Sequence, residues 1–498
     1  MLRAMRRVVC LSCAFVLLGG CSPGLSASAP PQSDAGPGGE DGDASTLAYT
    51  PQGCAYTVSP PESWHYEDLA LDDTTTPVDP TTGAPERVRL GLGGGTTKGQ
   101  PGYADPTTTA AFTWETAASN RAARVRLGTS ASALTQVQSG YSFTVHPILG
   151  TQDAYFHEVH VCGLEPATTY FYQVGGGPTG SQVWGATQSF TTMPATGTIT
   201  VGVFGDARQT KDPWQAVHMR MRDAGVAMSL VGGDVVALGA EESLYSEWLD
   251  AIWKDPNDPT KFLALGQSYI LSINGNHEND TSTSFANWAI PGDGPYAKTY
   301  ASFDLGSAHI TMVDDEQIAD APTGPEAQSQ LAWVDRDLQA AAGDRANHPF
   351  IVVISHRGLY STSQHATDSD VLAARGVLAP LFDKYGVSLV VNGHDHEYER
   401  TVPIHASSPD ATGDPVPSAQ GTTYVICAGA GAEPYAVGTT PVSWRQTKTA
   451  FGTGTPYIGT YSLLTIASRQ LTLRAYGMKA SSTTVAGDDV IDMVQLSH

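Results

Sequence analysis

The stretch VSLVVNGHDHEYER, residues 387–400, joins an apolar run to a dense group of polar side chains. The run Val387–Val391 is rich in β-branched residues, which is typical of a buried strand, and Gly393 is expected to end that strand. His394 and His396 follow directly after the turn. Imidazole nitrogens are frequent ligands of transition metals in proteins. The stretch therefore predicts a strand that delivers metal ligands at its carboxyl end.

The same pattern occurs at four earlier places in the chain. Apolar runs end in a turn residue and a potential metal ligand in TITVGVFG-Asp206, AMSLVGG-Asp234, YILSING-Asn276-His277 and FIVVIS-His356. One strand that ends in a polar turn residue would be ordinary, but five such strand ends favour a common function. Ligands of open α/β sheets gather at the carboxyl ends of the strands. We therefore predict that these strand ends form the dinuclear metal site of a hydrolase.

Segments with helical periodicity separate these runs from residue 195 onward. Apolar residues recur three or four positions apart in Trp214–Met221, Leu244–Ile252, Leu331–Leu338 and Leu372–Tyr385. The alternation of strands and helices predicts βαβ units, in a sheet with helices on its faces. An insertion rich in Pro, Ser and Gly at 404–420 interrupts this order, and the chain after it is predicted to be all-β.

Residues 84–194 instead show short alternating runs without helical periodicity. These runs are ERVRLGLG, TAAFTWET, ARVRLGT, FHEVHVCGL, TYFYQVGG and TQSFTTMP, and turn residues separate them. Strands at this spacing predict a β-sandwich, and Trp114 is expected in its core. The sequence from Gly163 to Tyr170 resembles the corner of fibronectin type III domains, in which the Tyr hydroxyl bonds to the backbone.

The first twenty residues resemble an export signal. Three arginines precede the apolar stretch Val8–Leu18, which is too short to cross a membrane stably. The sequence Leu18-Gly19-Gly20-Cys21 resembles the lipobox of bacterial lipoproteins. This resemblance implies removal of residues 1–20 and a lipid on Cys21. It implies an exported protein anchored in the bacterial cell envelope, at the outer membrane or its periplasmic face.

Residues 21–83 are predicted to be a tether followed by a partly packed N-terminal segment. Residues 22–50 are rich in Ser, Pro, Gly and Ala and have little to bury. Aromatic residues within 51–83 indicate that part of this stretch packs on the sandwich. Cys54 and Cys162 are candidates for a disulfide in an exported protein.

The composition excludes some classes of partner. The net charge is −23, which repels nucleic acid and anionic lipid surfaces. We therefore expect no nucleic-acid binding, and we expect any membrane attachment to come from the lipid on Cys21. Cys427 lies in the apolar run TYVICAGAG and is expected to be a small buried residue.

The polar strand ends together resemble the motifs of a known enzyme family. Gly205-Asp206, Gly233-Asp234, Gly275-Asn276-His277-Glu278, Ser355-His356 and Gly393–Arg400 resemble the motifs of calcineurin-like metallophosphoesterases. The purple acid phosphatase branch is the most similar, because it shares the GNHE and GHxHxYER forms and carries a fibronectin-like domain before the catalytic domain. The resemblance implies an α+β multidomain fold. A fibronectin III-like β-sandwich at 84–194 would precede a four-layer α/β/β/α phosphoesterase domain at 195–498.

The resemblance also implies a role for each polar residue. The metal ligands would be Asp206 and His396 for the first ion, Asn276, His356 and His394 for the second, and Asp234 as the bridge. His277 would lie just outside these ligands and face the phosphate. His365 would protonate the leaving group, with an exposed loop histidine as the alternative.

Two positions depart from the family pattern. Purple acid phosphatases have Gly-Asp-x-x-Tyr, whose tyrosinate binds ferric iron, but Ala237 stands at that position here. Many other members have Asp-x-His where this chain has Asp206-Ala207-Arg208. The expected cofactors are two divalent or mixed-valence ions, with Fe(II), Zn, Mn or Ca favoured over ferric iron. Arg208 is a candidate phosphate clamp or, alternatively, a surface residue.

The implied activity is hydrolysis of a small phosphate ester by a hydroxide that bridges the two ions. A phosphomonoester is the first expectation, because the purple acid phosphatase branch acts on monoesters. A phosphodiesterase or nucleotidase is the alternative within the enzymes. A non-catalytic binding lipoprotein on a phosphoesterase scaffold is the alternative of another class. The missing ligand at Ala237 favours that last reading, and the retention of the other ligands opposes it.

Overall fold

The computed structural model describes residues 47–59, 66–150, 152–292, 298–408, 411–435 and 441–498. Residues 46–498 form one compact unit. The predicted export signal, the Cys21 that is expected to carry a lipid and most of the predicted tether lie outside the described residues. Among the helices that are described, none combines the length and the apolar character needed to span a membrane.

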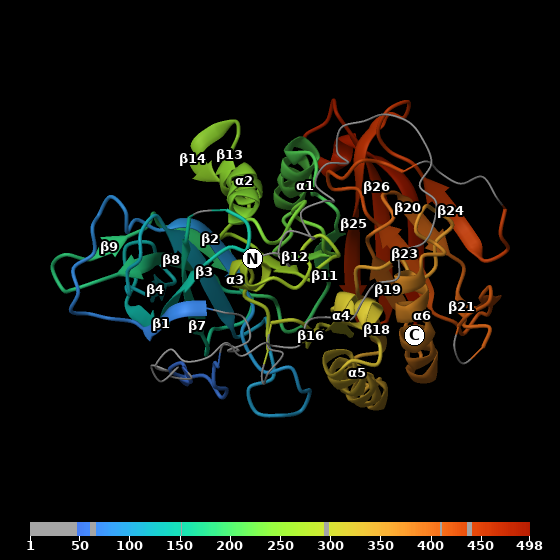
Figure 1. Cartoon of the computed structure of the whole chain (residues 1–498), viewed down its shortest axis with the longest axis horizontal. Helices are drawn as coiled ribbons and strands as arrows, with labels where there is room; N and C mark the ends of the chain where they lie inside the picture. The colour runs from blue at the N-terminus through green and yellow to red at the C-terminus, as the bar shows by residue number, and fades with distance from the viewer. Residues whose placement is uncertain (1–46, 60–65, 151, 293–297, 409–410, 436–440) are drawn as a thin grey trace, which may run out of the picture. The chain divides into compact units, whose positions relative to one another are not determined.

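Two antiparallel sheets form the N-terminal part of this unit (Figure 1). One contains, in spatial order, β1 (Tyr66–Leu71), β6 (Tyr141–Val145), β7 (Ala154–Val161), β3 (Ala110–Thr116) and β2 (Glu86–Gly91). The other contains β10 (Gln188–Thr191), β8 (Thr169–Gly176), β4 (Arg124–Gly128) and β5 (Gln136–Ser139), with β9 (Val183–Trp184) paired to β8. Trp114 is fully buried in the core between them, so the predicted sandwich is confirmed.

Local contacts secure the sandwich and the segment before it. The backbone N–H of Glu165 donates to the hydroxyl of Tyr170 at 2.9 Å, as in the fibronectin type III corner. A disulfide joins Cys54 to Cys162, at the end of β7, which confirms the candidate pair. Val58 packs in a small apolar cluster on the strands of the sandwich. Described residues of the segment before the sandwich therefore pack on it.

Two further sheets lie face to face in the C-terminal part. The first contains β15 (Tyr269–Ser272), β12 (Met228–Val231), β11 (Ile199–Phe204), β25 (Tyr457–Ala467), β26 (Gln470–Lys479) and β27 (Asp489–Ser497). The second contains β16 (Ala301–Leu305), β17 (Ala308–Met312), β18 (Phe350–Ile354), β19 (Leu389–Asn392), β23 (Thr423–Cys427), β20 (Tyr398–Thr401) and β24 (Arg445–Thr449). Apolar residues of both sheets share one buried core, and Cys427 is part of it, as predicted.

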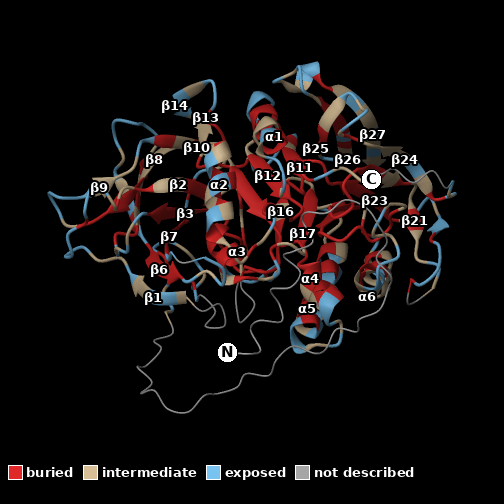
Figure 2. Cartoon of the chain, turned by 45° about the horizontal axis from the view of Figure 1, so that its top comes forward, coloured by how far each residue is buried: buried red, intermediate tan, exposed pale blue. Residues whose placement is uncertain are grey.

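Helices cover the outer face of each of these sheets. The helices are α1 (Lys211–Asp223), α2 (Glu242–Trp253), α4 (Asp315–Asp320), α5 (Pro325–Gly343) and α6 (Ser369–Tyr385), whereas α3 (Ser282–Asn287) packs on β6 of the sandwich. One core joins α1 and α2 to the first sheet, and another joins α4, α5 and α6 to the second. Figure 2 shows buried strands between helices whose outer surfaces are exposed. These layers confirm the four-layer α/β/β/α arrangement.

Short elements complete the described chain. Two small hairpins are formed by β13 (Lys254–Asp255) with β14 (Asp258–Phe262) and by β21 (Ile404–His405) with β22 (Val416–Pro417). A short 3₁₀ turn covers Val485–Gly487. The second hairpin lies within the insertion that the sequence predicts at 404–420.

One sheet runs through both parts of the molecule, which the sequence did not predict. Strands β2 and β15 pair in parallel at Leu90 and Tyr269, so the two sheets that contain them form one sheet of eleven strands. The hydroxyl of Tyr269 donates to the carbonyl of Thr109 at 3.0 Å, and that of Tyr172 donates to the carbonyl of Gly266 at 2.6 Å. The sandwich is therefore joined to the C-terminal part by backbone pairing as well as by side chains.

Candidate metal centre

The predicted ligands follow directly after the ends of five strands. Asp206 follows β11, Asp234 follows β12, Asn276 follows β15, His356 follows β18, and His394 and His396 follow β19. Asp206, Asp234 and His394 adopt φ angles of 61°, 54° and 71°. Residues with a side chain seldom adopt such angles, and those that do are often found at functional sites.

Two glycines allow the turns to approach the ligands closely. A Cβ atom on Gly275 would lie 2.3 Å from Asp234 Oδ1. A Cβ atom on Gly393 would lie 2.5 Å from Asp206 Oδ2. Both distances are shorter than van der Waals contact, so any larger residue would displace a carboxylate. These glycines are therefore part of what positions the ligands.

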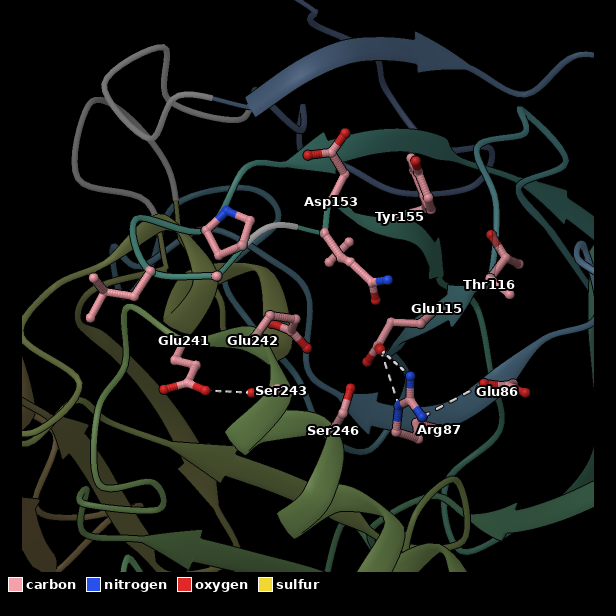
Figure 3. Close-up of a pocket in the computed structure, with 16 residues that line it drawn as sticks. Glu86, Arg87, Glu115, Thr116, Asp153, Tyr155, Glu241, Glu242, Ser243 and Ser246 are labelled. Carbon is pink, nitrogen blue, oxygen red and sulfur yellow. Dashed lines mark hydrogen bonds and ion pairs between the residues drawn. The ribbon is translucent and has the colours of Figure 1, made fainter.

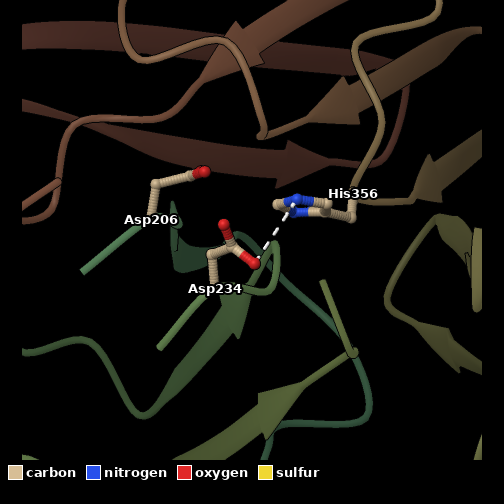
Figure 4. A group of neighbouring side chains, drawn as sticks. All are labelled: Asp206, Asp234 and His356. Atoms are coloured by element: carbon tan, nitrogen blue, oxygen red, sulfur yellow. Dashed lines mark ion pairs between the residues drawn. The ribbon is translucent and has the colours of Figure 1, made fainter. Parts of the chain in front are cut away.

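Five of the six predicted ligands lie together, and four of them are buried. Donor atoms of Asp206, Asp234 and His356 all lie within 4.8 Å of one another, and all three side chains are buried (Figure 4). His356 Nε2 lies 3.6 Å from Asp234 Oδ1. Asn276 Oδ1 lies 3.1 Å from His356 Nε2 and 3.0 Å from His394 Nδ1. The five strand ends therefore meet at one place, as the sequence predicts.

Arg208 lies beside the other oxygen of Asp234 and also contacts His396. Arg208 Nε is 3.2 Å from Asp234 Oδ2, and Arg208 Nη2 is 3.3 Å from His396 Nε2. His396 Nε2 is also 3.6 Å from Asp206 Oδ1. The side chain of Arg208 is only 13% exposed, so its interpretation as a surface residue is wrong.

The chemistry of the cluster fits a bound metal ion. Burial lowers the pKa of His356 to about 4 and that of His396 to about 3, so both imidazoles are neutral near pH 7 and can act as ligands. Among the described residues, Asp206 Oδ2 and His394 Nε2 are buried and have no hydrogen-bond partner. Buried polar atoms normally have partners, and a metal ion would satisfy both of these.

Two buried carboxylates hold the ligand turns in place. Glu278 accepts hydrogen bonds from the backbone N–H groups of Asp234–Val236 and Gly275, at 2.8 to 3.2 Å. Asp315 accepts one from the backbone N–H of His356 at 2.9 Å. Sequence reasoning missed both roles. The GNHE motif contains Glu278 and could have indicated it, whereas no motif marks Asp315.

Two further histidines and a tyrosine surround the cluster. The half-buried His277 lies with its Nδ1 2.8 Å from the carbonyl of Ala237. The ring of His365 lies 4.4 Å from that of His394, which places it beside the metal cluster rather than in a free loop. His365 Nε2 lies 3.2 Å from the hydroxyl of Tyr435. Sequence analysis did not consider Tyr435, because no motif contains it.

A separate hollow of about 590 Å³ lies between the sandwich and α2 (Figure 3). Five of its sixteen lining residues are carboxylates, and Arg87 forms ion pairs with two of them, Glu86 and Glu115. None of the predicted metal ligands lines it. The hollow is therefore distinct from the metal cluster.

Comparison with family models divides the chain into two matched regions. Residues 100–192 match the family described as "Purple acid Phosphatase, N-terminal domain". Residues 199–398 match the calcineurin-like phosphoesterase family. The second region contains every predicted metal ligand.

Relatives and solved structures agree with these matches. Purple acid phosphatase 22 of Arabidopsis thaliana is 27% identical over 52% of this chain and 56% of its own length. Human acid phosphatase type 7 is 31% identical over 36% of this chain and 44% of its own length. The structure of purple acid phosphatase PPD1 from yellow lupin seeds superposes with a TM-score of 0.64 and 18% identity, over 83% of this chain and 74% of that one. The structure of PhoD gives a TM-score of 0.52 and 11% identity, over 86% and 92%.

Residues 199–398 therefore form a calcineurin-like phosphoesterase domain, of a family that binds a dinuclear metal centre. With the domain in front of it, the chain is similar, more narrowly, to the purple acid phosphatases. The matched region spans less than two thirds of the length of Arabidopsis purple acid phosphatases 22 and 18, at 56% and 65%.

Proposed function

We propose that this chain hydrolyses small phosphate esters, with a phosphomonoester as the substrate. The observation that carries the proposal is the buried cluster of Asp206, Asp234 and His356, with Asn276 and His394 in contact with it. An ion of Zn, Mn or Fe held by these residues would polarise a phosphoryl oxygen and make a nucleophile from water near neutral pH.

His277 would bind the phosphate from outside the metal ligands. Its Nδ1–H donates to the carbonyl of Ala237, which fixes the ring, and its backbone N–H donates to Asp234 Oδ1 at 3.0 Å. The ring is therefore tied to the turn that carries the bridging carboxylate. When protonated, its Nε2–H would be free to donate to a phosphate oxygen.

His365 would supply the proton to the leaving alcohol. Asp368 Oδ2 lies 2.8 Å from its Nδ1, which would fix the orientation of the ring. Its Nε2 contacts the Tyr435 hydroxyl beside the cluster. A proton donor at this place would stabilise the departing oxygen, which a monoester of an ordinary alcohol requires.

Substrate choice tests this proposal against its alternatives. The full chain is treated with chelator, loaded with Mn²⁺ or Zn²⁺, and assayed with p-nitrophenyl phosphate and bis(p-nitrophenyl) phosphate. Faster hydrolysis of the monoester supports the proposal. Preference for the bis-ester would favour a phosphodiesterase. Metal binding without hydrolysis of either ester would favour a binding protein.

We also propose that the protein is exported and anchored through a lipid on Cys21. The sequence around Cys21 supports this, and so does the disulfide between Cys54 and Cys162, because disulfides persist in oxidising compartments. Mass spectrometry of the mature N-terminus tests it directly. A Cys21→Ser chain should lack the lipid and leave the membrane fraction, and an unmodified Cys21 in the wild-type chain would refute the anchor.

A further inference from the structure

Arg208 lies where the first of two metal ions is expected. The predicted ligands of that ion are Asp206, His396 and one oxygen of the bridging Asp234. The Arg208 guanidinium contacts Asp234 Oδ2 through Nε at 3.2 Å and His396 Nε2 through Nη2 at 3.3 Å. These are atoms that would have to bind the ion.

The hydrogen bonds of His396 show which of its nitrogens is involved. Its Nδ1 donates to the carbonyl oxygen of Glu433 at 2.5 Å, so the lone pair of the neutral ring is on Nε2. Arg208 donates to that lone pair. The same lone pair cannot accept an N–H and bind a metal ion at once. Because an arginine stays protonated in proteins, it would also repel a cation at this place.

On the opposite side of Asp234, no guanidinium of the described residues contacts the predicted ligands, because that of Arg357 is paired with Glu316 and Asp370. Asp234 Oδ1 faces His356, and Asn276 Oδ1 contacts both His356 and His394. Donor atoms of Asp206, Asp234 and His356 lie within 4.8 Å of one another, and Asp206 Oδ2 and His394 Nε2 are among the buried atoms of the described residues that lack a hydrogen-bond partner. The residues therefore fit one ion at this position and do not fit a second ion beside Arg208.

We infer that this chain holds one metal ion, with the guanidinium of Arg208 as a fixed positive charge in place of the other. The inference rests on the proposed phosphoesterase function for its catalytic meaning. The positive charge on the His396 side of Asp234 then belongs to an amino-acid side chain and not to a bound ion. It stays in the site when a chelator removes the ion.

Counting bound Mn²⁺ tests the inference without an activity assay. The chelated full-length chain is loaded with excess Mn²⁺, desalted and analysed for manganese per chain and by electron paramagnetic resonance. We expect one ion per chain and the spectrum of isolated Mn(II). In Arg208→His, which restores the Asp-x-His spacing, we expect two ions per chain and a spectrum of exchange-coupled Mn(II).

A matched control is Arg222→His, on α1, where Arg222 forms an ion pair with Asp255 away from the cluster. This variant should bind one ion, like the wild type. Arg208→Ala serves as a second variant if Arg208→His does not fold. Two coupled ions in the wild-type chain, or none, would overturn the inference, and so would one ion in a folded Arg208→His.

The two proposals fail in different ways. A chain that binds one ion but hydrolyses neither p-nitrophenyl phosphate nor its bis-ester leaves this inference intact and refutes the proposed function. A chain that binds two ions and hydrolyses the monoester refutes the inference and leaves the function intact.

Discussion

The ring of Tyr435 stacks on the ring of His396, with 4.0 Å between their centroids and 20° between their planes. Tyr435 follows β23, far along the chain from the Gly-Asp-x-x-Tyr motif that is incomplete here at Ala237. A tyrosine therefore lies beside the metal cluster, although the expected tyrosine position holds an alanine. Burial raises the pKa of Tyr435 to about 12, so its phenol stays protonated near neutral pH.

The first prediction concerns colour. Because Ala237 cannot supply a tyrosinate, the chain loaded with ferric iron should lack a tyrosinate-to-iron absorption band in the visible range. Absorption spectra before and after reduction check this. A band that disappears on reduction and is absent from Tyr435→Phe would instead show that Tyr435 reaches the iron.

The second prediction concerns the carboxylate between Arg208 and His356. Asp234→Asn removes its negative charge, so the ion should bind more weakly and kcat/KM for p-nitrophenyl phosphate should fall at least about 100-fold. Steady-state kinetics and metal analysis on the same samples measure both effects. Asp255→Asn, on β13 and paired with Arg222, is the matched control and should resemble the wild type. Full metal content with normal turnover in Asp234→Asn would exclude this site.

The third prediction tests whether His365 acts as a proton donor or only positions other groups. If His365 protonates the leaving oxygen, His365→Gln should slow hydrolysis of phenyl phosphate by about 10²–10⁴-fold. Hydrolysis of p-nitrophenyl phosphate should fall much less, because p-nitrophenolate leaves without a proton. His405→Gln, which loses a contact to Asp383 away from the cluster, is the control. Equal losses with both substrates would assign His365 a positioning role.

The fourth prediction concerns the pH dependence of stability. Burial disfavours a charge on His309, but Asp337 and Asp304 outweigh it and raise the pKa of His309 to about 9. In the unfolded chain the pKa of a histidine is near 6.5, which is lower than the folded-state pKa of His309. The stability that the protonated His309 contributes is therefore complete below about pH 6.5 and is lost as the pH rises toward 9. The free energy of unfolding should fall over this window by on the order of 3 kcal/mol.

Chemical denaturation at several pH values measures this fall. His309→Gln should be less stable at pH 6 and should show little change in the unfolding free energy between pH 6.5 and 9. An equally steep decline in His309→Gln would mean that other groups cause it.

The sequence predicted the features that depend on local patterns. Apolar β-branched runs that end in glycine or serine and a ligand marked the strand ends that hold Asp206, Asp234 and His356. Strand alternation and Trp114 marked the sandwich. These predictions succeeded because burial and turn chemistry are encoded within a few residues.

Features that depend on contacts between distant segments could not be predicted in this way. The position of Tyr435 depends on a loop after β23 that carries no motif, and the burial of Arg208 depends on where His396 lies. The pairing of Leu90 with Tyr269 likewise joins strands that are distant in the chain. Nothing in the neighbouring residues of either strand specifies its partner.

The pairing of β2 with β15 has a consequence for how this protein can change in evolution. A phosphoesterase domain without its sandwich would expose the backbone groups of β15, and an exposed strand edge invites aggregation. The core that the two parts share would be opened to water at the same time. Loss or exchange of the sandwich alone should therefore be selected against. The two domains are expected to be inherited as a single unit, although their sequences match separate families.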